Sequence, residues 1–146
     1  NVSDVVIRDN TFVNIGKGGG KPQSVLQISP EIAPEYRGKD YYHGRIVFEN
    51  NTVRTFDAQV IYGLGVKALV IRNNTFIQSL DYKPIFDGLS FFDFQYCKNI
   101  DIEGNSFEGN HEAEVSAQDC ETILLKKQKG FHDKVVEKPN RFFYRQ

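Results

Sequence analysis

The sequence predicts an all-β fold, a parallel β-helix in which about five coils (rungs) of a solenoid stack on one another. Three observations lead to this prediction. A short phrase recurs along the 146 residues, its copies follow a constant 23-residue step once loop insertions are removed, and equivalent positions hold similar residues. A coil of that length accommodates two or three short strands and their bends, but not a strand, a helix and two loops.

The recurring phrase is an apolar segment followed by Asn and then by Thr or Ser. The first copy reads Val-Ile-Arg-Asp-Asn-Thr-Phe, and the phrase occupies residues 6–12, 47–53, 70–76 and 101–107, with a decayed copy at 124–130. The second Asn of the copies is Asn10, Asn51, Asn74 and Asn105, with Gln128 in the decayed copy. These positions are separated by 41, 23, 31 and 23 residues.

A second apolar segment follows each copy, at 25–29, 60–62, 91–94 and 114–117. Aligning Ile28, Ile61, Phe92 and Val115 as one column divides the base coil into steps of 10 and 13 residues. The longer intervals then contain three loop insertions, two of 8 residues and one of 10. We expect these loops at 16–22, 30–43 and 78–90.

Apolar residues recur three and five positions before the Asn and two positions after it. The position three residues before it is occupied by Ile7, Phe48, Ile71, Ile102 and Leu125. Alternation with a constant apolar phase indicates a strand with one face directed inward. We therefore expect like side chains to stack on one another in the core.

The residue before the Asn is expected to form a bend with a left-handed backbone. It is Asp9, Asn50, Asn73, Gly104 and Lys127, and four of these five are types that tolerate positive φ. The Asn column itself (Asn10, Asn51, Asn74 and Asn105) is expected to form a structural ladder of stacked amides inside the solenoid. The alternative is a ligand site, but a ladder explains better why every coil has the residue.

Composition and charge exclude several classes of function. A net charge of −1 gives no basic surface for nucleic acid, and no apolar run is long enough to cross a membrane. The high aromatic content, 12 Phe and 7 Tyr without Trp, suits stacked interior columns. No signal peptide is visible, and 146 residues fit one domain.

The two cysteines, Cys97 and Cys120, lie 23 residues apart and so occupy one column. Side chains stacked in register point the same way, which favours stacked thiols over a disulfide. The three His residues are far apart and no Cys-x-x-Cys is present. The sequence therefore predicts no metal site and no cofactor.

Residues 2–5 already fit inside a coil, and nothing before them is expected to cover its edge. We therefore expect residues 1–130 to be coils of a longer solenoid. Their uncapped end would pair with missing upstream coils of the same protein or with another copy of the chain. Residues 131–146 form a cap, a last strand or an exit toward another domain, and the sequence leaves these alternatives open.

The repeated Ile-x-x-Asn-x-Phe pattern on a coil of this length resembles right-handed parallel β-helix proteins, most of which act on carbohydrates. Residues 25–31, 44–53 and 73–76 are similar to the late coils of bacterial α-1,3-galactosidases of glycoside hydrolase family 110. The resemblance implies a right-handed fold, a saccharide substrate, inverting hydrolysis by two carboxylates, and secretion or a periplasmic location in bacteria. A non-catalytic carbohydrate-binding module and a structural or adhesin solenoid remain the alternatives.

Outward positions of the second segment supply candidate catalytic carboxylates, Asp93 and Glu114. They lie one coil apart and two residues along, or about 8 Å from strand spacings. Inverting glycosidases separate their carboxyl groups by about 6.5–9.5 Å to admit water. The simpler interpretation is that both are solvated surface charges.

Aromatic side chains near this pair are candidate platforms for a sugar ring, and they are Tyr62, Phe91 and Tyr96. The second loop adds candidate carbohydrate-binding residues, Glu31 and Arg37, because loops on a rigid scaffold often carry binding groups. The simpler interpretation of this loop is a surface segment that packs on its neighbour.

Overall fold

The computed structural model describes residues 2–14, 24–56, 58–84 and 88–138. Within these ranges the chain is all-β, with three parallel sheets and one short 3-10 helix, η1 (Pro34–Tyr36). The predicted class, an all-β chain wound as a parallel, β-helix-like solenoid, agrees with this architecture.

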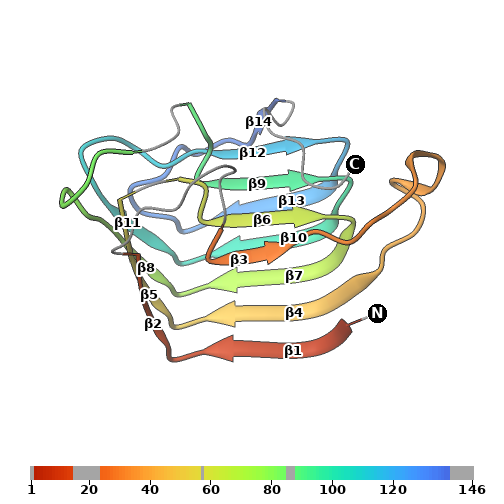
Figure 1. Cartoon of the computed structure of the whole chain (residues 1–146), viewed down its shortest axis with the longest axis horizontal. Coiled ribbons are helices and arrows are strands. Elements are labelled where there is room, and N and C mark those ends of the chain that lie inside the picture. The colour runs from red at the N-terminus through yellow and green to blue at the C-terminus, as the bar shows by residue number, and fades with distance from the viewer. Residues whose placement is uncertain (1, 15–23, 57, 85–87, 139–146) are drawn as a thin grey trace.

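The chain visits the three sheets in turn, so that strands far apart in sequence lie side by side (Figure 1). Sheet A contains β1 (Val2–Arg8), β4 (His43–Glu49), β7 (Val66–Arg72), β10 (Lys98–Glu103) and β13 (Glu121–Lys126). Sheet B contains β2 (Thr11–Val13), β5 (Thr52–Thr55), β8 (Thr75–Gln78) and β11 (Ser106–Glu108). Sheet C contains β3 (Leu26–Ile28), β6 (Ile61–Leu64), β9 (Phe92–Gln95), β12 (Val115–Gln118) and β14 (Val136–Glu137).

Like residues stack on like in sheet A, as the sequence columns predict. Ile7 pairs with Phe48, Phe48 with Ile71, and Ile71 in turn with Ile102. Phe48, Ile71 and Ile102 are at most 1% exposed. Sheet B continues the core with Phe76, whose ring packs edge-on against Phe91 at a centroid distance of 5.2 Å.

The predicted register of sheet C is wrong in its first strand. Ile61 pairs with Phe92 and Phe92 with Val115, as expected, but the partner of Ile61 in β3 is Leu26 and not Ile28. A shift of two residues leaves every side chain on the same face of the sheet, so alternation cannot detect it. The loop predicted at 16–22 lies outside the described residues.

Positive φ recurs at equivalent bends. The predicted column has φ of 59°, 54°, 55°, 69° and 53° at Asp9, Asn50, Asn73, Gly104 and Lys127. Two further columns with positive φ were not predicted. The first, in sheet A, contains Asp4, Arg45, Ala68, Asn99 and Thr122. The second, at the end of sheet C, contains Gly65, Tyr96 and Asp119. Half of these residues (Arg45, Ala68, Thr122 and Tyr96) are not types that favour positive φ, so the composition of the two columns gives no consistent signal.

The corner between sheets A and B has the same length in every coil. Two residues, such as Asp9 and Asn10 or Asn73 and Asn74, separate the end of each sheet A strand from the sheet B strand that follows. The predicted insertions instead fall between sheets B and C or between C and A. In Figure 1 the loop between β3 and β4 projects at the opposite end of the strands from this corner.

Asparagine side chains at this corner join each coil to the previous one. The Oδ1 atom of Asn74 accepts from the backbone N–H of Asn51 at 2.9 Å, while its Nδ2 donates to the carbonyl of Phe48 at 3.0 Å. Asn105 repeats both bonds with Asn74 and Ile71, each at 2.9 Å. Asn51, Asn74 and Asn105 are each 1% exposed, so these backbone groups have no access to water.

The two ends of the asparagine ladder differ. Gln128 takes the place of Asn and its Oε1 accepts from the N–H of Asn105 at 2.9 Å. Asn10 is exposed at the other end. A cavity of about 340 Å³ among β1, β3 and β4 is lined mainly by apolar residues, which include Val5, Leu26 and Ile46. The described part of the C-terminal segment continues the solenoid, because β14 pairs with β12.

We predict that Asn74→Ala destabilises the chain by about 2–5 kcal/mol, because it leaves the Asn51 N–H and the Phe48 carbonyl buried without partners. Urea denaturation measures the free energy of unfolding. Asn10→Ala is the matched control and should lower it by less than about 1 kcal/mol, since Asn10 is exposed. Equal effects of the two changes would contradict the role of burial in the ladder.

We predict that Lys127→Gly stabilises the chain by about 1 kcal/mol, because a left-handed backbone costs a residue with a Cβ about that much. Lys127 is exposed and has φ of 53°, so the substitution removes no packing. Lys126→Gly in the neighbouring strand position is the control and should destabilise it. Thermal unfolding of both variants tests whether Lys127 has a left-handed backbone. A lower melting temperature for Lys127→Gly would contradict it.

Candidate functional site

A polar column runs along sheet C on the face opposite Ile61 and Phe92. Gln27 pairs with Tyr62, Tyr62 with Asp93, and Asp93 with Ser116. Alternation along β9 places Phe92 and Phe94 in the apolar core, which turns the carboxylate between them away from it. Asp93 is nevertheless only 4% exposed.

Asp93 is a buried carboxyl group with a hydrogen-bonded neighbour. The Gln59 Nε2 donates to its Oδ2 at 2.9 Å. Burial raises the pKa of Asp93 to about 6, although the neighbouring polar groups of Gln95, Ser116 and Gln59 and the charge of Lys138 oppose this shift. Removal from water disfavours the charged form, so Asp93 retains its proton at a higher pH than an exposed aspartate does.

The surroundings of Glu114 favour its charged form, unlike those of Asp93. Its Oε2 lies 3.0 Å from the Lys138 Nζ and accepts from the Ser90 Oγ at 3.0 Å. Desolvation alone would raise the pKa of Glu114, but the bonds from Lys138 and Ser90 outweigh it and lower that pKa. Glu114 is therefore held as a carboxylate.

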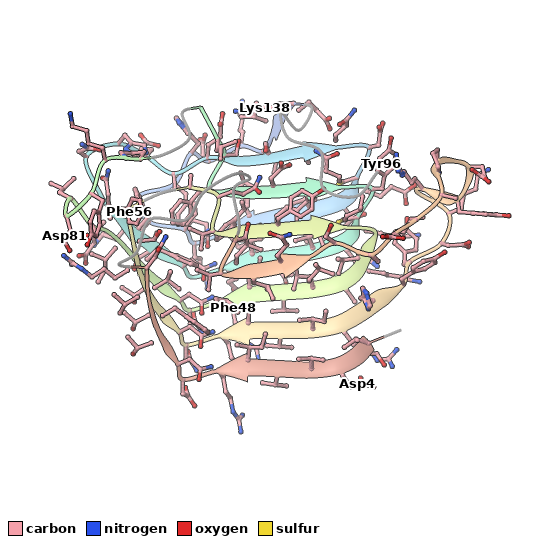
Figure 2. The ribbon with its side chains drawn as sticks, in the orientation of Figure 1. Asp4, Phe48, Phe56, Asp81, Tyr96 and Lys138 are labelled. Carbon is pink, nitrogen blue, oxygen red and sulfur yellow. The ribbon has the colours of Figure 1, made fainter. Side chains whose placement is uncertain are left out.

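The two acids are close in the sheet. The backbone N–H of Phe91 donates to the Glu114 carbonyl at 2.9 Å, so Glu114 lies two residues before the partner of Asp93. Strand geometry then separates their Cα atoms by about 8 Å. Lys138 contacts Glu114 directly and its charge also acts on Asp93. Figure 2 shows Lys138 at the β14 edge of the molecule.

Two predicted sugar platforms do not lie on an open face. Phe91 was expected to point outward, but it is 7% exposed and belongs to the core, 4.9 Å from the Phe107 ring centroid. The alternation used to assign it fails because β9 begins only at Phe92. Tyr62 does lie on the polar column but is fully buried, against Leu64 and Tyr96.

The remaining candidates lie at the other end of sheet C. Tyr96 follows β9, and its ring lies beside Gly38 of the projecting loop. Arg37 uses its Nε to bond the Ile32 carbonyl at 3.1 Å, which fixes the loop on itself. Glu31 is exposed in the same loop. The structure thus brings Asp93 and Glu114 together and places Tyr96, Arg37 and Glu31 apart from them.

Sequence reasoning missed three polar partners of the acids, Gln59, Ser90 and Lys138. Gln59 and Ser90 each lie two residues before a sheet C strand, at equivalent positions. That equivalence is the one signal that could have found them. Lys138 reaches Glu114 only because β14 pairs with β12, which no repeat in the sequence indicates.

Among the residues that the structure describes, no group of three or more His, Cys, Asp or Glu could hold a metal ion. Cys97 and Cys120 are free, and the Cys97 N–H donates to the Cys120 Sγ at 3.3 Å. No helix in the same ranges is long and apolar enough to span a membrane.

Fold and site together define a parallel β-solenoid with a carboxyl pair on one sheet face. Comparison with known proteins relates this chain to enzymes. Alpha-1,3-galactosidase A of Bacteroides fragilis is 34% identical over 128 residues, which are 86% of this chain and 20% of that protein. Alpha-1,3-galactosidase B of Phocaeicola vulgatus is 32% identical over 116 residues, or 75% of this chain and 19% of that protein.

A further relative, alpha-1,3-galactosidase B of Akkermansia muciniphila, is 34% identical over 103 residues, or 70% of this chain and 13% of that protein. The chain therefore spans about a fifth or less of the length of these curated relatives. These homologues support a relationship to glycoside hydrolase family 110. No family model matches the chain, and no solved structure matches it.

We predict that Asp93→Asn stabilises the chain above pH 6 by about 2–3 kcal/mol and leaves it unchanged near pH 4. The folded pKa of Asp93 is raised to about 6, so wild-type stability is full below the unfolded pKa and falls as pH rises through 6. The side-chain oxygen of Asn can still accept the Gln59 hydrogen bond, and because Asn does not ionise, the variant does not lose stability as pH rises. Denaturation across pH measures the difference, with the exposed Glu108→Gln as control. A variant less stable at every pH would contradict the assignment.

Proposed function

We propose that the chain is the C-terminal β-helix portion of a glycoside hydrolase that cleaves α-galactosides with inversion. In this proposal Asp93 is the general acid and Glu114 the general base. The galactosidase names of the homologues support the substrate class. The opposed pKa shifts of the two acids support the assignment of roles.

The chemistry requires one acid that keeps a proton and one that has lost it. Asp93, with a pKa of about 6, can protonate the leaving oxygen near neutral pH. Glu114, with its pKa lowered, can take a proton from water on the other side of the sugar. A spacing of about 8 Å leaves room for that water.

The proposal requires a local rearrangement when a sugar binds. Asp93 is 4% exposed, and the Lys138 ammonium contacts the Glu114 oxygen that a water molecule would use. Lys138 must therefore shift from the Oε2 of Glu114 while its charge stays close enough to keep that carboxylate ionised, and Gln59 must turn from Asp93, before both acids reach substrate. Gln59 and Lys138 are side chains with several rotatable bonds, which suits this movement.

The proposal extends to the whole protein. We place this chain among the late coils of a right-handed β-helix, with about five coils built on 23 residues and three loop insertions. The apolar cavity at the β1 edge suits further upstream coils or a second copy of the chain. The isolated chain is expected to be inactive, and the parent to be secreted or periplasmic in a bacterium.

A second candidate is a non-catalytic module, either carbohydrate-binding or a structural, adhesin-type solenoid. The deep burial of Asp93 favours it, because a buried carboxyl group can serve packing alone. A glycan array separates the two non-catalytic roles. Binding without hydrolysis would indicate a carbohydrate-binding module, and no binding a structural one.

We predict that Asp93→Asn and Glu114→Gln each lower hydrolysis of nitrophenyl α-galactoside by about 10²–10⁴-fold, the usual contribution of a general acid or base. The assay uses the full-length protein that contains this chain, with NMR of the released galactose anomer. Glu108→Gln is the matched control and should retain activity. Full activity in either acid variant, or release of the α-anomer, would refute the assigned mechanism.

A further inference from the structure

A second cavity lies on sheet A, away from the carboxyl pair on sheet C. It has a volume of about 500 Å³ and is lined by the first residues of β1, β4 and β7 and by the end of the projecting loop. Ligand pockets commonly occupy about 300–1,000 Å³, so a sugar ring fits. Figure 2 labels Asp4 at this corner of the molecule.

Small residues create the hollow. Ser3, Gly44 and Lys67 occupy one column of sheet A, where Ser3 pairs with Gly44 and Gly44 with Lys67. A Cβ at position 44 would collide with the backbone oxygen of Lys67, so only glycine fits there. Ser3 and Gly44 place no bulky side chain on this part of the cavity, and Lys67 lines it beside them.

The charge of this column is unbalanced. Lys67 lies directly opposite Lys98 on the next strand, and like charges in that position repel. Lys98 is 3.5 Å from Glu121, and Arg45 is 2.6 Å from Asp4. Among the described residues Lys67 forms no such ion pair. An anion beside Lys67 would relieve the repulsion and supply the missing counter-charge.

The loop wall adds aromatic and hydrogen-bonding groups. Tyr41, Tyr42 and His43 are half-buried and line the cavity. The His43 Nδ1 accepts from the Val2 N–H at 3.0 Å, and burial lowers the pKa of His43, so the neutral ring has its proton on Nε2. Burial also raises the pKa of Tyr41, which keeps its hydroxyl protonated.

We propose that this cavity binds a saccharide carrying a sulfate or carboxylate group, with the anion at Lys67 and the ring against Tyr41 and Tyr42. The choice of a sugar as the scaffold rests on the proposed function, whereas the anion rests on the unbalanced lysine. The cavity differs from the carboxyl pair in sheet and in charge. It would hold part of an acidic glycan and perform no chemistry.

Isothermal titration of the chain with galactose 6-sulfate, galacturonate, galactose and inorganic sulfate tests this proposal. Binding of the two acidic sugars, with galactose and sulfate each at least ten-fold weaker, is the expected result. Lys67→Gln should weaken the acidic sugars by about ten-fold or more, because a charged hydrogen bond is lost. Arg8→Gln, an exposed cation at the other end of β1, is the matched control and should bind as wild type does.

Each other outcome would overturn the proposal. Galactose binding as tightly as the acidic sugars would exclude a role for the anion. Sulfate binding as tightly would indicate an adventitious ion only, and unchanged binding by Lys67→Gln or no binding at all would remove the site. Circular dichroism confirms that each variant is folded, and no hydrolysis is measured, so failure of the proposed catalysis leaves this test unaffected.

Discussion

The structure depends on one repeated hydrogen bond, from a buried backbone N–H to the asparagine of the coil that follows. At three of the corners between sheets A and B the asparagine is buried, and the backbone polar groups beside it have no water to bond. Asn51, Asn74 and Asn105 satisfy those groups through both atoms of their amides. The left-handed residue before each of them turns the amide inward. The stacking of Phe48 and Ile71 in the neighbouring strands follows from the same register.

The stacking of coils also brings Asp93 and Glu114 close together on sheet C. Asp93 and Glu114 are both carboxyl groups on neighbouring coils, yet their environments shift their pKa in opposite directions. Burial dominates at Asp93, whereas Lys138 and Ser90 together outweigh it at Glu114. Lys138 contacts Glu114 and its charge also acts on Asp93, so one side chain directly after β14 affects both acids. Such divergence between neighbouring acids is typical of catalytic sites, although structural ion pairs produce it too.

The fold could be predicted from residue types because its corners repeat them. The Asn column and the apolar positions beside it give the register of sheet A without any structure. In sheet C the period of two leaves a shift such as Leu26 for Ile28 undetectable, and the direction of Phe91 depends on where β9 starts. Asp93 and Glu114 could be chosen from spacing, but the burial of Tyr62 and the approach of Lys138 depend on tertiary packing.

The constant two-residue corner between sheets A and B has a consequence for how such proteins diversify. Any residue added there would break an amide bond to the adjacent coil, while length added at the other two corners leaves the register untouched. Variation in length is thereby confined to the corners between sheets B and C and between sheets C and A. The loops at those two corners can therefore change in length and sequence while the stacked interior stays the same.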